Sequence, residues 1–221
     1  MPIIVPVMIV VIVGLAVYGF YLSAKRRKEL EGWARSRGLR FDPSKDSGMD
    51  CRYGSFKCLQ QGSERYAYNV MTGKHAGLGV TAFDYHYTTG SGKNRSDHYF
   101  SAAIVRSGLP LKLLRIRPEG FLDKVGEFFG LDDIDFESAE FSRTFHVTSP
   151  DKRWAYAVID QRMMEYLIAA PRFSLELAVM DVIAWRERRF RPADFDAAIG
   201  VIEGMLRRLP EYLVREIKEG S

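Results

Sequence analysis

The chain has 221 residues, a formal net charge of +4 and 47% hydrophobic residues. The charge is distributed unevenly. Residues 2–24 carry no charged side chain, whereas residues 25–40 hold seven of the 32 basic residues and only two of the 28 acidic ones. The rest of the chain has 25 basic and 26 acidic residues, a net charge of −1. This balance argues against a general nucleic-acid binder, whose basic surface should extend over the folded body.

The first predicted element is a membrane-spanning helix within residues 1–24. The run 3–22 has no charge, and 20 helical residues span roughly 30 Å, the thickness of the hydrocarbon core of a bilayer. The alternative is a cleaved signal peptide, which would place positive charge before a shorter apolar run and end at a small-x-small cleavage site. Here the charge follows the run, so a retained transmembrane helix is the preferred interpretation.

The basic cluster Lys25, Arg26, Arg27 and Lys28 comes immediately after this run. By the positive-inside rule it stays in the cytoplasm, so the N-terminus faces out and the domain faces in. The cluster can also attract anionic lipid headgroups, at about 1 kcal/mol for each basic residue near the surface. Residues 25–38 keep helical spacing and are predicted to form a juxtamembrane helix, continuous or hinged with the span, that Gly38 can cap.

Residues 39–221 are long enough for one domain, and their first part is rich in predicted strands. The segments 39–41, 56–59, 65–71 and 111–116 are expected to be strands. Segments 78–88 and 98–106 should form a hairpin around the polar, glycine-rich loop 89–96. Neighbouring strands of this kind predict an α+β fold with a largely antiparallel sheet and packed helices.

Helical signals dominate the second part of the domain. Helices are expected over 121–130, from Ser149-Pro150 onward, over 161–169 and from Pro192 onward, where Pro at the first helical position is favourable. Segment 141–147 alternates like a strand, as does 173–179, onto which 182–185 is expected to pair back.

One stretch resembles a known family. Residues 137–147 read E-S-A-E-F-S-R-T-F-H-V and are followed by Asp151, Ala155 and the run 163–167. The stretch is similar to a family of uncharacterised bacterial single-span membrane proteins. That family shares an E-S-x-E-F-x-x-x-F-x-V strand followed by two helices. The similarity covers about 35 residues. It implies a bacterial origin and a single domain, and because that domain has no known function it implies no catalytic residues.

A metal site is the main chemical candidate in the sequence. If the two strands of the hairpin pair in the register in which the numbers of opposite residues sum to 184, His86 lies opposite His98. Asp84 is then two residues away on the same face. Two imidazoles and a carboxylate can bind Zn²⁺ and leave a position open for water. A shift of one residue in register would move His98 to the other face, and cross-strand packing is the competing interpretation.

Two further groups have weaker chemical readings. The acidic residues Asp133, Asp135 and Glu137 share a face if extended, and a solvated strand edge is preferred there over a cation site. Cys51 and Cys58 could lie opposite each other in a hairpin. They are expected to be thiols in the cytoplasm, and their spacing matches no recognised metal or redox motif.

The sequence therefore favours a bacterial inner-membrane protein, with a single span and a cytoplasmic domain that acts as a binding or scaffolding module. Its expected partners are the lipid bilayer and, as a second candidate, another membrane-associated protein. No nucleic acid and no cofactor are expected, and the oligomeric state is open. An enzyme is less favoured than a binding module. The alternative function, if the protein is an enzyme, is a membrane-tethered metal-dependent hydrolase using Asp84, His86 and His98.

Overall fold

The computed structural model describes residues 4–119 and 133–219, without the side chains of residues 4–7, 9 and 10. The elements in chain order are α1 (Ile4–Ser36), β1 (Arg40–Asp42), α2 (Met49–Arg52), η1 (Lys57–Gln60), β2 (Ser63–His75), β3 (Leu78–Thr89), η2 (Gly92–Asn94), β4 (Ser96–Pro118), α3 (Ala139–Thr144), β5 (Phe145–Thr148), α4 (Lys152–Val158), α5 (Gln161–Ala169), β6 (Ser174–Arg186), α6 (Pro192–Leu206) and α7 (Glu211–Glu219). The expected mixed α+β architecture with an antiparallel sheet is confirmed.

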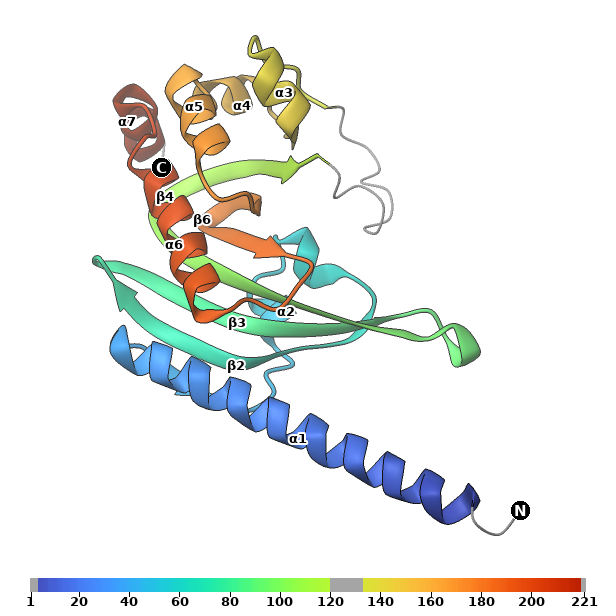
Figure 1. The fold of residues 1–221 in the computed structure, drawn as a ribbon. Coiled ribbons are helices and arrows are strands. Elements are labelled where there is room, and N and C mark those ends of the chain that lie inside the picture. The colour runs from blue at the N-terminus through green and yellow to red at the C-terminus, as the bar shows by residue number, and fades with distance from the viewer. Residues whose placement is uncertain (1–3, 120–132, 220–221) are drawn as a thin grey trace.

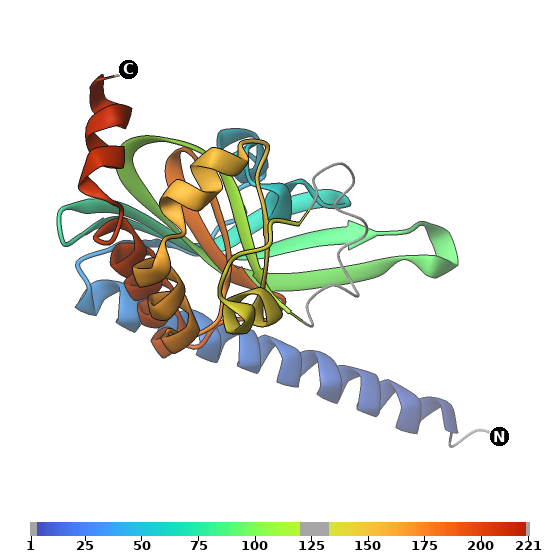
Figure 2. The same cartoon turned by 90° about the horizontal axis from the view of Figure 1, so that it is seen from above.

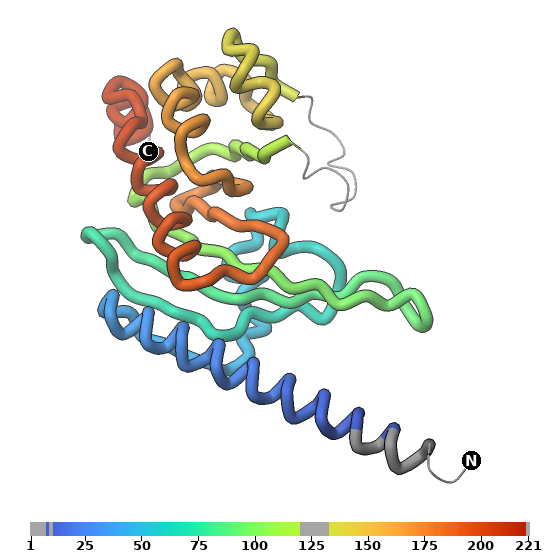
Figure 3. Tube along the Cα trace, viewed as in Figure 1, coloured from blue at the N-terminus to red at the C-terminus, as the bar shows by residue number. Residues whose placement is uncertain are grey.

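The sheet has six strands in the order β1-β2-β3-β4-β5, with β6 paired to β4, and every pairing is antiparallel. β2, β3 and β4 follow one another as consecutive hairpins, which Figure 3 traces along the chain. β4 is long enough to pair with β3 over its first half and with β5 at its end, while β6 lies along its other edge. This strand therefore joins the two ends of the sheet.

Two apolar clusters lie on opposite faces of the sheet. The larger one contains side chains of α1, α4, α5 and α6, and the smaller one lies beneath α2 and η1. Alternation along β3 explains the division, because Val80 and Ala82 belong to the larger cluster whereas Phe83 and Tyr85 belong to the smaller one. Figure 1 shows α1 passing along β2 and α6 crossing the same side of the sheet.

α1 is one continuous helix of 33 residues, so the predicted span and the predicted juxtamembrane helix are not separated by a hinge. Its second half belongs to the domain core, where Leu30, Trp33 and Ala34 are buried. Its first half leaves the domain on the same side as the tip of the β3–β4 hairpin (Figures 1 and 2). The large apolar side chains described there are exposed, up to 79% for Phe20.

Within the described residues, no helix combines the length and apolar character needed to cross a membrane. Part of the predicted span of residues 1–24 lies outside the described residues. The helix expected over 121–130 lies entirely outside them.

Several local expectations are confirmed. The hairpin around 89–96, the helix over Gln161–Ala169 and the helix beginning at Pro192 all form. The two helices could be predicted from local sequence alone, because Asp160 caps α5 and Pro192 is at the favourable first position of α6.

Other expectations are wrong. Segment 141–147 is a strand only from Phe145, where β5 begins; its first part is helical, because Ser138 accepts a hydrogen bond from the Phe141 amide and caps α3. Segments 173–179 and 182–185 belong to one strand, β6, which pairs with β4 and has a positive φ of 58° at Val179, where β4 has extra residues and the register shifts. The helix expected from Ser149-Pro150 begins at Lys152 instead, since Asp151 is its N-cap residue.

Candidate functional site

A buried ion pair attaches α1 to the sheet. The Arg26 guanidinium donates from Nε to Asp84 Oδ2 at 2.9 Å and from Nη2 to Asp84 Oδ1 at 2.5 Å. Asp84, near the middle of β3, is fully buried, and the Arg26 side chain is 19% exposed. A third donor, Arg26 Nη1, reaches the carbonyl oxygen of Phe190 at 2.9 Å, in the loop before α6. A two-pronged contact of this kind fixes the helix in position as well as orientation.

Two neutral donors complete the shell of Asp84. Asn69 donates to Oδ2 at 2.9 Å, and Ser101 donates to Oδ1. Asn69 reaches inward because β2 has one extra residue between Tyr68 and Met71, and Asn tolerates the positive φ of 51° at this bulge. The carboxylate thus has no unmet acceptor capacity that a ligand would need to fill.

The electrostatics agree with this geometry. Burial opposes the charge on Arg26, but the hydrogen bond and the charge of Asp84 outweigh it and raise the guanidinium pKa above its ordinary value. Arg26 therefore differs from the other members of the predicted membrane-surface cluster. Lys25, Arg27 and Lys28 are exposed, as expected of surface residues, whereas Arg26 points into the fold.

A cavity of about 250 Å³ lies beside this ion pair, between α1 and the sheet; we call it the cationic pocket. Its lining residues come from α1, the β1–α2 loop, β2, β4 and the β6–α6 loop. They are Ser23, Arg26, Arg27, Pro43, Lys45, Tyr66, Tyr68, Asn69, Tyr99 and Arg189. None of them is acidic.

Three of the cations in this lining lack a carboxylate partner. Among the residues that the structure describes, Arg27, Lys45 and Arg189 form no salt bridge, whereas Arg26 is neutralised by Asp84. Lys45 lies 4.1 Å from the ring centre of Tyr66, and Arg189 lies 4.6 Å from that of Tyr99. The aromatic rings thus already face cations, and the pocket has an excess of positive charge.

Tyr68 adds a hydroxyl group without a partner to the same wall. Its oxygen is buried and has no hydrogen-bond partner among the described residues. Burial, followed by the charge of Asp84, raises the pKa of Tyr68, so the hydroxyl is protonated and available as a donor at neutral pH. A buried donor without an acceptor is costly, which makes this oxygen a candidate ligand contact.

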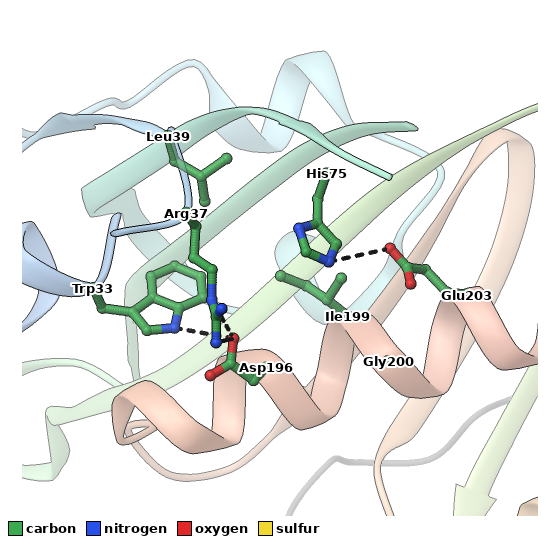
Figure 4. A pocket seen from close by; sticks show the side chains of 8 residues that line it. All are labelled: Trp33, Arg37, Leu39, His75, Asp196, Ile199, Gly200 and Glu203. Atoms are coloured by element: carbon green, nitrogen blue, oxygen red, sulfur yellow. Dashed lines mark hydrogen bonds and ion pairs between the residues drawn. The ribbon is translucent and has the colours of Figure 1, made fainter. Parts of the chain in front are cut away.

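A second cavity, of about 210 Å³, lies at the other end of the docked part of α1, against α6; we call it the His75 pocket. It contains charges of both signs, and the buried Glu203 Oε1 has no hydrogen-bond partner among the described residues. Arg37 and the Trp33 indole both donate to Asp196 Oδ1, at 3.0 and 3.1 Å, and His75 Nε2 lies 3.8 Å from Glu203 (Figure 4).

The hypothetical metal site does not form. The numbers of paired residues across the hairpin sum to 185, so His86 lies opposite Tyr99 and His98 opposite Tyr87. This one-residue difference places His98 on the face opposite to Asp84 and His86, and the three side chains do not converge. In the ranges 4–119 and 133–219, no cluster of three or more His, Cys, Asp or Glu side chains could hold a metal ion.

Both histidines have ordinary partners instead. Both ring nitrogens of His86 are bonded, Nδ1 to the Glu64 carbonyl at 3.2 Å and Nε2 to Asp97 at 3.0 Å. The His98 ring stacks on Tyr87 with ring centres 4.7 Å apart. The competing interpretation, cross-strand packing, therefore describes these residues.

The other two candidate groups also have structural contacts. Asp133 pairs with His146 at 3.0 Å and accepts from the amides of Ile134 and Val147. Cys51 is exposed on α2 and Cys58 is buried in η1; both are free thiols, and a turn between the two short helices joins them in place of a hairpin. Burial raises the pKa of the Cys58 thiol, which keeps it protonated.

Sequence reasoning missed the inward role of Arg26, although a signal was available. Arg26, Leu30, Trp33 and Arg37 follow a spacing of four, three and four, which places them on one helix face. The buried members of this set, Leu30 and Trp33, mark the face that docks on the domain. The pocket itself depends on loops far apart in the sequence and has no local signal.

Comparisons with known proteins bear on the fold. No protein-family model matches the chain, and a search of curated proteins gives no match. Among solved structures, the chain is similar to the crystal structure of the mycobacterial trehalose monomycolate transport factor A, TtfA, with a TM-score of 0.63 and 16% sequence identity. The similarity covers 83% of this chain and 96% of the TtfA chain. At this identity the comparison establishes a shared fold.

Proposed function

We propose that this protein is a non-catalytic binding module, held at the bacterial cell membrane by the N-terminal part of α1, that assists transport. The observation that carries the proposal is the division of α1 into two halves. One half is fixed in the domain by Arg26 and Trp33, and the other projects from it with apolar side chains exposed around the helix.

Exposed apolar side chains of this number need a nonaqueous environment. The residues concerned are Met8, Val11, Ile12, Val13, Leu15, Val17, Tyr18, Phe20, Tyr21 and Leu22. A contiguous apolar surface is costly in water and is characteristic of a membrane or protein contact. The charge-free sequence of residues 2–24, followed at once by four basic residues, supports a membrane contact and, by the positive-inside rule, a cytoplasmic domain.

The transport role is supported by likeness of fold to a transport factor, TtfA, over most of both chains. A binding module fits the site better than an enzyme does, because the cationic pocket presents positive charge, aromatic rings and a hydroxyl donor. These groups recognise an anion, whereas a hydrolase would place a nucleophile or general base at such a site.

Extraction of membranes tests the anchor. The full chain should remain in the bacterial membrane fraction after washing with high salt and with alkaline carbonate, and detergent should release it. A chain that washes off would contradict the membrane anchor.

The native cysteines test the orientation. In osmotically intact spheroplasts, a membrane-impermeant maleimide should label the exposed Cys51 only after permeabilisation. Cys51→Ser is the control and should abolish labelling, because Cys58 is buried. Labelling of Cys51 before permeabilisation would reverse the orientation.

A further inference from the structure

The cationic pocket lies where a lipid headgroup would be if the proposed anchor is correct. Ser23, Arg26 and Arg27 follow Leu22, the last residue of the apolar run, by one to five positions. At about 1.5 Å rise per residue, they lie roughly 1.5–7.5 Å beyond the run along the helix axis. The headgroup layer on each side of the hydrocarbon core is about 5–7 Å deep, so these three residues of the pocket would lie at that level.

The charge of the pocket selects an anion. Arg27, Lys45 and Arg189 form no salt bridge among the described residues, and Asp84, the carboxylate that pairs with Arg26, is fully occupied. Guanidinium groups pair with phosphate oxygens in two-pronged contacts, and the Tyr68 hydroxyl is a further donor. A phosphate group has enough oxygen atoms to accept hydrogen bonds from both guanidinium groups and from this hydroxyl.

A zwitterionic choline headgroup fits less well. Aromatic rings can hold a quaternary ammonium, and Tyr66 and Tyr99 line the pocket. Lys45 and Arg189 already face these two rings, so an added cation would meet two like charges. The volume of about 250 Å³ is below the roughly 300–1,000 Å³ typical of pockets for drug-sized ligands, and it suits a headgroup.

We infer that the cationic pocket binds the phosphodiester of an anionic membrane lipid through Arg27 and Arg189, with Lys45 and the Tyr68 hydroxyl as further contacts. This inference rests on the proposed membrane anchor and deepens it. The bound lipid would hold the domain close to the membrane surface and fix its rotation about α1.

The test uses the full chain in nonionic detergent, with lipid binding measured by native mass spectrometry. The probes are phosphatidylglycerol, phosphatidylcholine and inorganic phosphate. We expect one phosphatidylglycerol molecule to bind at least 10-fold more tightly than phosphatidylcholine, and Arg27→Gln/Arg189→Gln to reduce this preference by at least 10-fold. A tenfold change corresponds to about 1.4 kcal/mol, which is within the range expected for the loss of a charge-assisted hydrogen bond.

A matched control separates the pocket from general charge. Arg162→Gln/Arg215→Gln removes two exposed arginines from α5 and α7, so it changes the net charge equally, and it should leave the preference unchanged. Equal affinity for the two lipids, or an equal loss in both double variants, would overturn the inference. Binding of inorganic phosphate without a preference for phosphatidylglycerol would also overturn it, since the ligand would then be a free anion.

Failure of the anchor and failure of the lipid site give different results. A chain that stays in carbonate-washed membranes but shows no preference for phosphatidylglycerol refutes the lipid site alone. A chain that prefers phosphatidylglycerol in detergent but washes off membranes refutes the anchor alone. Arg27→Gln/Arg189→Gln should remain in the membrane fraction, because neither residue belongs to the apolar run.

Discussion

The two cavities at either end of the docked part of α1 differ in how their charges are balanced. In the His75 pocket, Asp196 neutralises Arg37, and Glu203 lies 3.9 Å from Arg207 and 3.8 Å from His75. In the cationic pocket, only Arg26 has a carboxylate partner among the described residues, and Arg27, Lys45 and Arg189 do not. A cavity that holds charges of both signs contains its own counter-charges, whereas one with an excess of a single sign favours a ligand of the opposite sign.

The largest effect on stability is expected at Arg26, which lines the cationic pocket and also forms the buried ion pair with Asp84. Arg26→Ala leaves Asp84 buried without its charge partner and should lower the free energy of unfolding by about 3–5 kcal/mol. Chemical denaturation of the full chain in detergent measures this. In Arg26→Gln/Asp84→Asn the loss should be smaller than the sum of the two single losses; additive losses would show that the pair is not coupled.

A smaller effect is expected at Asp194, in the first turn of α6, the helix that carries the acidic residues of the His75 pocket. Burial alone would raise the pKa of this carboxyl, but hydrogen bonds from Arg188 and the Arg191 amide, with their charges, lower it to about 2. Against an ordinary value of 3.8, this corresponds to about 2 kcal/mol of stability at neutral pH. Asp194→Asn should therefore lower the free energy of unfolding at neutral pH by about 2 kcal/mol.

The pH dependence of this loss has a defined sign. Because the pKa is lower in the folded chain than in the unfolded one, the contribution is complete above about pH 4 and disappears as the pH falls towards 2. The difference in unfolding free energy between wild type and Asp194→Asn should therefore narrow over that range. A difference that is constant from pH 7 to pH 2 would contradict the role of the charge.

Two glycines of α6 provide a matched pair. A Cβ at Gly204 would collide with the Tyr166 ring, so Gly204→Ala should cost about 1–3 kcal/mol. Gly200 lines the His75 pocket with nothing within 4 Å of an added Cβ, so Gly200→Ala should stabilise α6 by about 0.5–1 kcal/mol. Thermal unfolding of both variants checks the signs. Gly200→Ala should also leave phosphatidylglycerol binding intact.

The smallest effect on stability is expected in the cationic pocket. Arg27→Gln and Arg189→Gln break no salt bridge among the described residues, so each should change the unfolding free energy by less than about 1 kcal/mol. A larger loss in either variant, measured by denaturation, would show that these arginines serve the fold, and the contrast between the two pockets would fail.

Much of the fold could be predicted where the signal is local. Pro192 and the polar loop 89–96 mark a helix start and a hairpin through backbone preferences that operate without distant contacts. A strand over the whole of 141–147 was the wrong prediction, because Phe141 and Phe145 are four residues apart, a spacing that fits a helix face as well as alternation in a strand. The cap at Ser138 decided between the two.

The candidate site could be predicted only in part. The four basic residues after the apolar run were identified, but a run of like charges does not reveal which member turns inward; that depends on the helix face set by Leu30 and Trp33. The hairpin register could not be fixed either, since one residue of shift reverses every side chain, and this shift removed His98 from the hypothetical metal site.

The most direct test of the account is site-specific photocrosslinking of the full chain in native membranes. A benzophenone amino acid replaces Tyr99, which lines the cationic pocket and is 41% exposed, or His75, which lines the other pocket. Mass spectrometry of the irradiated protein should detect an anionic phospholipid adduct at position 99 and none at position 75. Equal adducts at both positions, or no lipid adduct at position 99, would contradict the account.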